Sequence, residues 1–256
     1  MAGKFFENLS DNYLKLLNYE EDFNVAINVG ESPNTKTFRA HSTILKYRSL
    51  YFNNELANTC KDENCIKIIN LNHISIQQFE IIIRYIYGGV VTLEKLDALL
   101  IFDLMLITHE LLFDVLTKFL ELYLIKTNTS WLRLNFTRIY EKSFQNNKFL
   151  ELQKWYNNIV TKYPNKVFDS ENFTFLQENA LISLIGHEDL QMEEVKIWNY
   201  IIKWGIAQDP NLSFDPSNWT KENFLSLNTI LKNCLPLIRY FQMSNDDIIE
   251  HVQPYH

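Results

Sequence analysis

The stretch that decides the fold is Phe38-Arg39-Ala40-His41-Ser42-Thr43-Ile44-Leu45. It follows the alternating segment Asp22-Phe23-Asn24-Val25-Ala26-Ile27-Asn28-Val29-Gly30 and leads into Arg48-Ser49-Leu50-Tyr51-Phe52. Near His41 the spacing of apolar residues changes from two, which is typical of a strand, to roughly 3.6, which is typical of a helix. The order therefore predicts a strand, a turn, a second strand and then two short helices.

Composition predicts a globular and mostly helical chain. The 256 residues are 46% hydrophobic and 14% aromatic, and they include only six Gly and six Pro. These values favour one or two domains with a real core over a loop-rich β-sandwich or a Rossmann-type fold. A net charge of -7 without a basic stripe opposes nucleic-acid binding.

Several features predict an intracellular protein that does not enter a membrane. The first residues lack an apolar signal core, and the most apolar run, residues 98–107, is broken by Asp103 and too short to span a bilayer. Cys60, Cys65 and Cys234 suit a reducing compartment better than a disulfide framework. We expect the cytoplasm, with the nucleus as the alternative location.

Apolar spacing places one more strand and a series of helices along the chain. A first helix over residues 5–18 carries an apolar stripe, and a third strand over 66–69 follows a polar loop. Further helices are expected at 74–87, 93–107 and 109–125, then, after a polar joint at 126–130, at 131–144, 149–162, 179–185, 193–207, 220–231 and 244–252. The helix at 93–107 is apolar around most of its circumference and is expected to be buried.

Four groups of residues, in this order and spacing, resemble a BTB/POZ domain over residues 22–126. They are Asp22, Val25, Val29 and Gly30; Phe38, Ala40, His41 and Leu45; Ser49, Tyr51 and Phe52; and Phe79, Ile83, Tyr85, Ile86, Tyr87 and Gly88. Residues 1–21 would then form an N-terminal dimerisation helix. The resemblance implies a small sheet flanked by helices, and a role in protein–protein interaction.

The second half, over residues 130–242, is similar to a BACK domain, an all-helical module, with residues 243–256 as a tail. The matching residues are Leu181, Leu184, Ile185, Leu190, Met192, Glu194, Ile197, Trp198, Ile201 and Trp204. The segments 204–208 and 235–241 look closest to fungal BTB-BACK proteins that carry a TLDc domain. Neither kelch repeats nor a TLDc domain are expected here. The expected fold class is α+β and mostly α.

The BTB resemblance implies a homodimer. In that family the N-terminal helix and the first strand form an apolar two-fold interface, and the corresponding residues here are Leu9, Tyr13, Leu16, Leu17 and Phe23. The residues alone support a partner surface, because an apolar stripe on a terminal helix needs its own core or a second copy to cover it.

The resemblance also implies a site for a cullin scaffold (type 3) of a ubiquitin ligase. In the family a hydrophobic-x-Glu motif follows the Tyr-Phe helix, whereas this chain has Cys60-Lys61-Asp62, which departs from the motif. The candidate cullin-binding residues are Tyr51, Phe52, Cys60, Asp62, Phe113 and Leu116.

Other functions remain open at this stage. The chain could be a dimerisation scaffold with no ubiquitin role, or a short form that pairs with longer BTB-BACK relatives, and a protein client is expected but not identified. Transcriptional repression is less favoured, because Ser42 stands where those relatives have a basic residue. We expect no enzyme, cofactor or metal: the spacing of Cys60, Cys65 and His73 matches no usual zinc site. His41 is expected to make a hydrogen bond within the packing.

Overall fold

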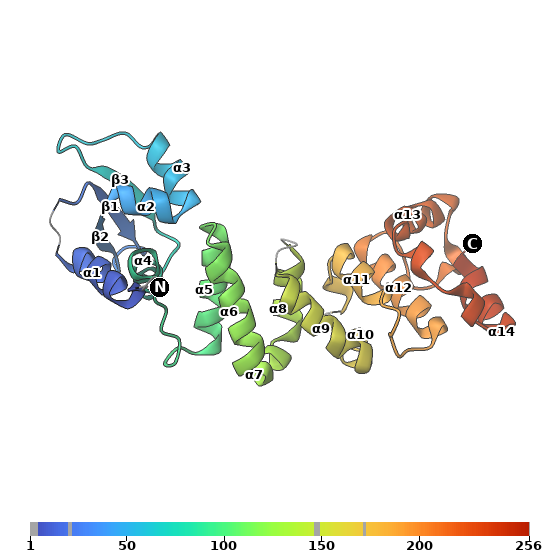
Figure 1. The fold of residues 1–256 in the computed structure, drawn as a ribbon. Helices are drawn as coiled ribbons and strands as arrows, with labels where there is room; N and C mark the ends of the chain where they lie inside the picture. The colour runs from blue at the N-terminus through green and yellow to red at the C-terminus, as the bar shows by residue number, and fades with distance from the viewer. Residues whose placement is uncertain (1–4, 20–21, 146–148, 171–172, 256) are drawn as a thin grey trace. The chain divides into compact units, whose positions relative to one another are not determined.

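The computed structural model describes residues 5–19, 22–145, 149–170 and 173–255. The chain splits into two compact units, Met1–Asn128 and Thr129–His256 (Figure 1). The first unit is a small sheet with helices and the second is helical, which confirms the α+β, mostly α fold class.

The sheet of the first unit has three strands, β1 (Val25–Val29), β2 (Lys36–Ala40) and β3 (Lys67–Leu71), in the order β2-β1-β3. β1 pairs antiparallel with β2 and parallel with β3. The β1–β2 connection needs Gly30, which has a φ of 90° and whose added Cβ would lie 2.3 Å from the Asn34 carbonyl oxygen. The predicted strand pair is confirmed, and the third strand ends two residues later than predicted.

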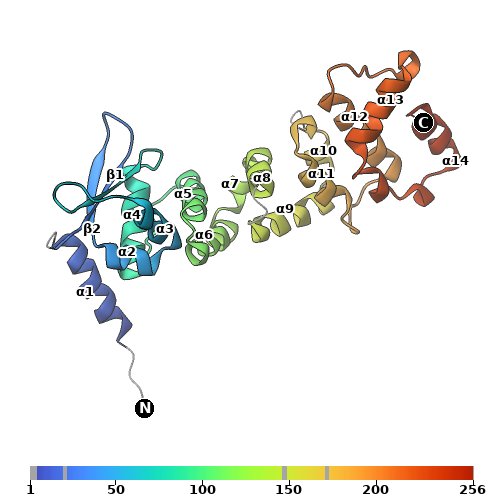
Figure 2. The same cartoon turned by 90° about the horizontal axis from the view of Figure 1, so that it is seen from above.

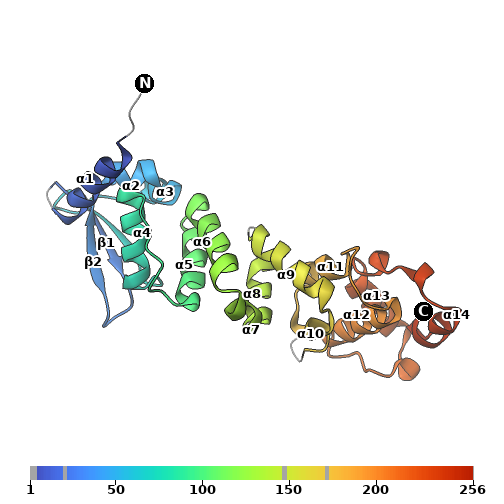
Figure 3. The same ribbon diagram turned by 60° about the horizontal axis from the view of Figure 1, so that its bottom comes forward.

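Helices α1 to α4 gather around this sheet (Figure 2). The helices of the unit are α1 (Phe6–Asn18), α2 (Ser42–Arg48), α3 (Leu50–Asn58), α4 (Ile76–Gly88), α5 (Ala98–Glu110) and α6 (Asp114–Thr127). α4 runs beside the sheet, with α1 and α2 packed against it (Figure 3). It begins at Ile76, two residues later than expected, because a Ser75–Gln78 capping box sets its first turn. It ends at Gly89, whose φ is 67°, as the Gly88-Gly89 pair in the sequence predicts.

The expected starts of the next two helices are wrong. α5 begins at Ala98 because the Asp97 side chain accepts a hydrogen bond from the Leu100 N–H and caps the helix there. α6 begins only at Asp114, because the chain turns just before it, with Leu112 at a φ of 59°. α5 is largely buried, as expected, although Leu99 remains 40% exposed.

The second unit is built from helices joined by short 3₁₀ turns. They are α7 (Thr129–Leu134), α8 (Phe136–Gln145), α9 (Leu150–Lys162), α10 (Asn165–Phe168), α11 (Glu178–Ile185), α12 (Glu194–Gln208), α13 (Lys221–Leu231) and α14 (Asn245–Asp247), which continues as a π-helical turn over Ile248–Val252. The helix expected over 131–144 is two helices. Between them lies Asn135, whose backbone N–H and side-chain amide both donate to the Trp131 carbonyl, over 3.0 and 2.9 Å, a local bonding pattern that Asn favours in turns.

Helix α12 is the centre of this unit. Trp198 and Trp204 are both buried, and their indole N–H groups donate to the carbonyls of His251 and Leu176. α12 also approaches α13 closely at Gly205, where an added Cβ would lie 2.8 Å from side-chain atoms of both Leu227 and Leu231.

This close approach makes Gly205→Ala destabilising, although alanine is the better helix former. We expect the overpacked contact to lower the free energy of unfolding by about 1 to 3 kcal/mol, measured by urea denaturation. In a Leu231→Ala background the same substitution should lower the free energy of unfolding by clearly less, because one of the two crowding side chains has been removed. An equal loss in both backgrounds would contradict the packing described for Gly205.

Candidate protein-interaction site

Helix α1 is attached to the end of α4 by one hydrogen bond and one close apolar contact. The Ser10 hydroxyl donates to the Gly88 carbonyl oxygen over 2.6 Å. A Cβ at Gly88 would lie 2.7 Å from Leu14 Cγ, so only glycine lets the two helices approach this closely. Ser10 and Leu14 are four residues apart and therefore lie on one side of α1.

A second side of α1 is apolar and open to solvent. It carries Phe6, Leu9, Tyr13 and Leu16, which are 67, 52, 39 and 37% exposed. Their spacing of three, four and three residues forms a continuous stripe, here called the α1 stripe. No residue of α1 is fully buried, so the helix packs one apolar side on α4 and keeps a second apolar side partly exposed to solvent.

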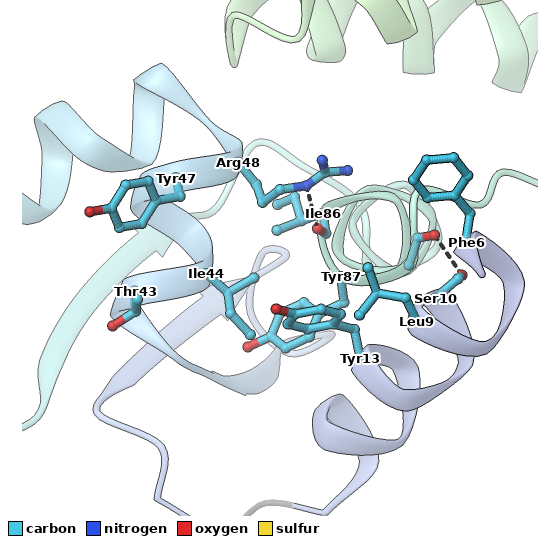
Figure 4. A pocket seen from close by; sticks show the side chains of 11 residues that line it. Phe6, Leu9, Ser10, Tyr13, Thr43, Ile44, Tyr47, Arg48, Ile86 and Tyr87 are labelled. Carbon is cyan, nitrogen blue, oxygen red and sulfur yellow. Dashed lines mark hydrogen bonds between the residues drawn. The ribbon is translucent and has the colours of Figure 1, made fainter. Parts of the chain in front are cut away.

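The α1 stripe borders a groove of about 490 Å³ (Figure 4). One wall is formed by Phe6, Leu9 and Tyr13 of α1, and the other by residues of α2 that include Ile44 and Tyr47. The Tyr47 side chain is 88% exposed. The groove is thus an apolar and aromatic depression beside an apolar ridge.

Tyr87 and Arg48 hold the base of this groove in place. The Arg48 Nε–H donates to the Ile86 carbonyl oxygen over 3.0 Å (Figure 4). The Tyr87 hydroxyl accepts the His41 backbone N–H over 2.9 Å and lies 2.8 Å from His41 Nδ1, which confirms the hydrogen bond expected for His41. Burial raises the pKa of Tyr87 to about 12, partly offset by the His41 N–H, so the phenol is neutral at physiological pH.

The structure separates the five residues predicted for a dimer interface. Leu9, Tyr13 and Leu16 lie together on the α1 stripe. Leu17 is half-buried and borders a different hollow, next to β2. Phe23 is half-buried, and the guanidinium carbon of Arg39 lies 4.7 Å from the centroid of the Phe23 ring. Phe23 is not among the described residues that line the groove.

The sequence did not reveal Phe6 as a member of the α1 stripe. It also did not reveal that Ser10 and Leu14 attach α1 to α4, or that Tyr47 lines the groove. The spacing of Phe6 from Leu9 is a helical signal that could have revealed it. No local pattern distinguishes Leu14, which faces α4, from Leu16, which faces solvent.

Three of the predicted cullin-binding residues, Phe52, Phe113 and Leu116, are core residues of this unit, and a role for them in cullin binding stays a prediction. Phe52 is fully buried and its ring lies 6.5 Å from that of Phe79, while Phe113 and Leu116 are 4% and 2% exposed. They pack the unit together. Tyr51 is half-buried. Its pKa is raised mainly by burial and, to a smaller extent, by the nearby carboxylates of Glu55 and Glu110.

Cys60 and Asp62 lie in an exposed loop whose shape Asp62 itself maintains. The Asp62 carboxylate accepts the backbone N–H groups of Asn64 and Ile66 over 2.9 and 2.8 Å. At the end of the loop, the Lys67 ammonium donates to the Leu56 carbonyl in the last turn of α3. These bonds fix the loop relative to α3 and leave the Cys60 side chain exposed.

A metal site in this region finds no support among the described residues. His73 Nε2 lies 2.8 Å from a Glu110 carboxylate oxygen. Within the described ranges, no three His, Cys, Asp or Glu side chains gather in a way that could hold a metal ion.

Comparison with known families identifies a BTB/POZ domain over residues 13–128 and a BACK domain, described as BTB And C-terminal Kelch, over residues 138–213. The chain therefore contains a BTB/POZ domain followed by a BACK domain. Both are domains of protein–protein interaction, not enzyme families.

Solved structures similar to this chain include the BTB domain of zebrafish PATZ1, at 20% identity over 50% of this chain and 99% of that chain, with a TM-score of 0.38. The BTB domain of human gigaxonin is 19% identical over 47% of this chain and 93% of that chain, with a TM-score of 0.36. Among curated proteins, none matches the sequence.

The buried Tyr87 hydroxyl predicts a particular loss of stability in alkali. The free energy of unfolding should fall as pH rises from about 10, where an unfolded tyrosine ionises, to about 12. Tyr87→Phe should reduce this alkaline slope and, by leaving the His41 N–H without its acceptor, lower stability at pH 7 by about 1 kcal/mol. The exposed Tyr47→Phe is the control, and an equal effect of both substitutions would contradict the role of Tyr87.

Proposed function

We propose that this protein is a homodimeric interaction adaptor, in which the BTB domain pairs two copies and the BACK domain holds a protein client. The observation that carries the proposal is the α1 stripe. It is an uncharged row of four large side chains on a helix that is already fixed to its own unit by Ser10 and Leu14. BTB domains commonly mediate self-association.

The shape of the surface supports a second copy as the partner. A two-fold interface uses the same patch on both copies, so the patch must fit itself. Here an apolar ridge, the α1 stripe, lies directly beside an apolar groove lined by Ile44 and Tyr47. Two copies related by a two-fold axis could each place the ridge in the groove of the other.

Charges on the α1 stripe should break the dimer. At micromolar concentration we expect the natural chain to sediment at about twice its 30.5 kDa, and Leu9→Asp with Tyr13→Asp at the monomer mass. Asn8→Asp adds a charge to the polar side of the same helix and should leave the dimer intact. Circular dichroism should be the same for all three proteins.

A monomeric natural chain would reject homodimerisation. If that monomer formed a complex only when mixed with a longer BTB-BACK protein, the heterodimerising short form would replace the homodimer. A dimer that survives both aspartates would show that another surface joins the copies.

We also propose that the BTB domain binds a cullin scaffold (type 3) next to α3, which would make the protein a substrate adaptor of a ubiquitin ligase. Cullin binding is common among BTB domains. The support in this chain is the loop after α3, in which hydrogen bonds of Asp62 and Lys67 fix the position of the exposed Cys60. Tyr51, in α3 itself, is partly exposed. The rival is a dimerisation scaffold with no ubiquitin role.

A pull-down with the cullin N-terminal domain separates these two functions. The natural chain should be retained, and Tyr51→Ala should weaken retention about tenfold, because Tyr51 is the predicted aromatic residue that keeps solvent exposure. Asn54→Ala, at an exposed position of the same helix, is the control. Failure of the natural dimer to bind the cullin domain would favour the simple scaffold.

We place this function in the cytoplasm, with the nucleus as the alternative. In the described part of the chain, every helix is too short or too polar to cross a membrane. Co-purification from the native cell followed by mass spectrometry would identify the client of the BACK domain.

A further inference from the structure

A second hollow of the BTB domain lies beside β2 and has a different character from the groove at α1. It measures about 440 Å³. One side is formed by four consecutive residues of β2, and the other by α4 and the end of α1. The lining residues that matter here are Lys36, Phe38, Arg39, Glu80, Ile83 and Arg84.

This hollow follows the free edge of the sheet. Successive side chains of a strand point to opposite faces, so a hollow that touches Lys36, Thr37, Phe38 and Arg39 must run along the strand edge. β2 is the outermost strand in the order β2-β1-β3, and among the described residues it pairs with β1 alone. Such an edge presents a row of backbone donors and acceptors to another extended chain.

The charge of the hollow is opposite to that of the whole protein. Among the described residues its lining contains three cations, Lys36, Arg39 and Arg84, and one carboxylate, Glu80, whereas the chain carries a net charge of -7. Glu80 lies 2.7 Å from Lys36, but both side chains are about half exposed. Exposed pairs of this kind are weak and can exchange partners.

We infer that this hollow binds an acidic segment of a partner protein in extended conformation, which adds a strand to β2. Backbone hydrogen bonds along the edge supply affinity, and carboxylates facing Lys36 and Arg84 supply specificity. The five residues of β2 match a peptide stretch of similar length, roughly 17 Å. The inference concerns a different surface from the proposed dimer interface and does not depend on it.

A peptide fits this hollow better than a nucleic acid does. Phe38 and Ile83 form an apolar floor but are almost completely buried, so the floor offers no open aromatic ring on which a base could stack. A strand edge instead matches the repeat of an extended polypeptide, which is roughly 3.3 Å per residue.

The test uses the full chain and a fluorescein-labelled ten-residue peptide of alternating glutamate and valine. Binding is measured at low salt from the fluorescence anisotropy of the labelled peptide. The acidic peptide should bind, and the same peptide with lysine for glutamate should not. Arg84→Glu should weaken binding about tenfold, and the control Lys95→Glu, an exposed cation outside the hollow, should change it less than twofold. Glu80→Gln should tighten binding, because it removes a carboxylate from the described lining of the hollow.

Strand addition is tested separately with two N-methylated peptides. One is methylated at the backbone nitrogens of its odd-numbered residues and the other at those of its even-numbered residues, which gives the two registers. One register should lose binding and the other should keep it, because only one edge of the peptide can pair with β2. Absence of saturable binding, equal weakening by Arg84→Glu and Lys95→Glu, or no difference between the two registers would each overturn the inference. A single-stranded oligonucleotide that binds as tightly as the peptide and responds to Arg84→Glu would assign the hollow to nucleic acid instead.

Discussion

The attachment of α1 to α4 determines what the BTB domain presents to other proteins. Gly88 has no side chain, so α1 can approach closely enough for Leu14 to pack on it and for the Ser10 hydroxyl to reach its carbonyl. Once this side of α1 is used, the rotation of the helix is fixed, and Phe6, Leu9, Tyr13 and Leu16 must face away from α4. A helix with apolar residues on only one side would have left nothing for a partner.

This arrangement gives one domain surfaces of different chemistry. The groove at α2 is apolar and is the surface proposed for a second copy, whereas the hollow along β2 carries cations and is the surface proposed for an acidic strand. The loop after α3 is a third feature, fixed by Asp62 and Lys67. We propose that the domain acts by placing several proteins next to one another.

Local patterns predicted the parts of the fold that depend on neighbouring residues. The β1–β2 pair, the hydrogen-bonded His41 and the glycine end of α4 all follow from spacing and backbone preference. The start of α5 was missed because the apolar residues before Asp97 resemble a helix, and only the cap sets its first turn. The burial of Phe52 depends on contacts with residues distant in sequence, such as Phe79, as does the hollow formed by β2 and α4, and no local pattern contains these contacts.

The most direct measurement of the central claim is hydrogen–deuterium exchange of the full chain over a range of protein concentrations. Residues 6–18 should exchange more slowly as concentration rises, because a second copy covers the exposed side of α1. Residues 194–208, buried within the BACK domain, should exchange at the same rate throughout. Exchange in α1 that is fast and independent of concentration would show that this side of the helix stays in water, and would contradict the account.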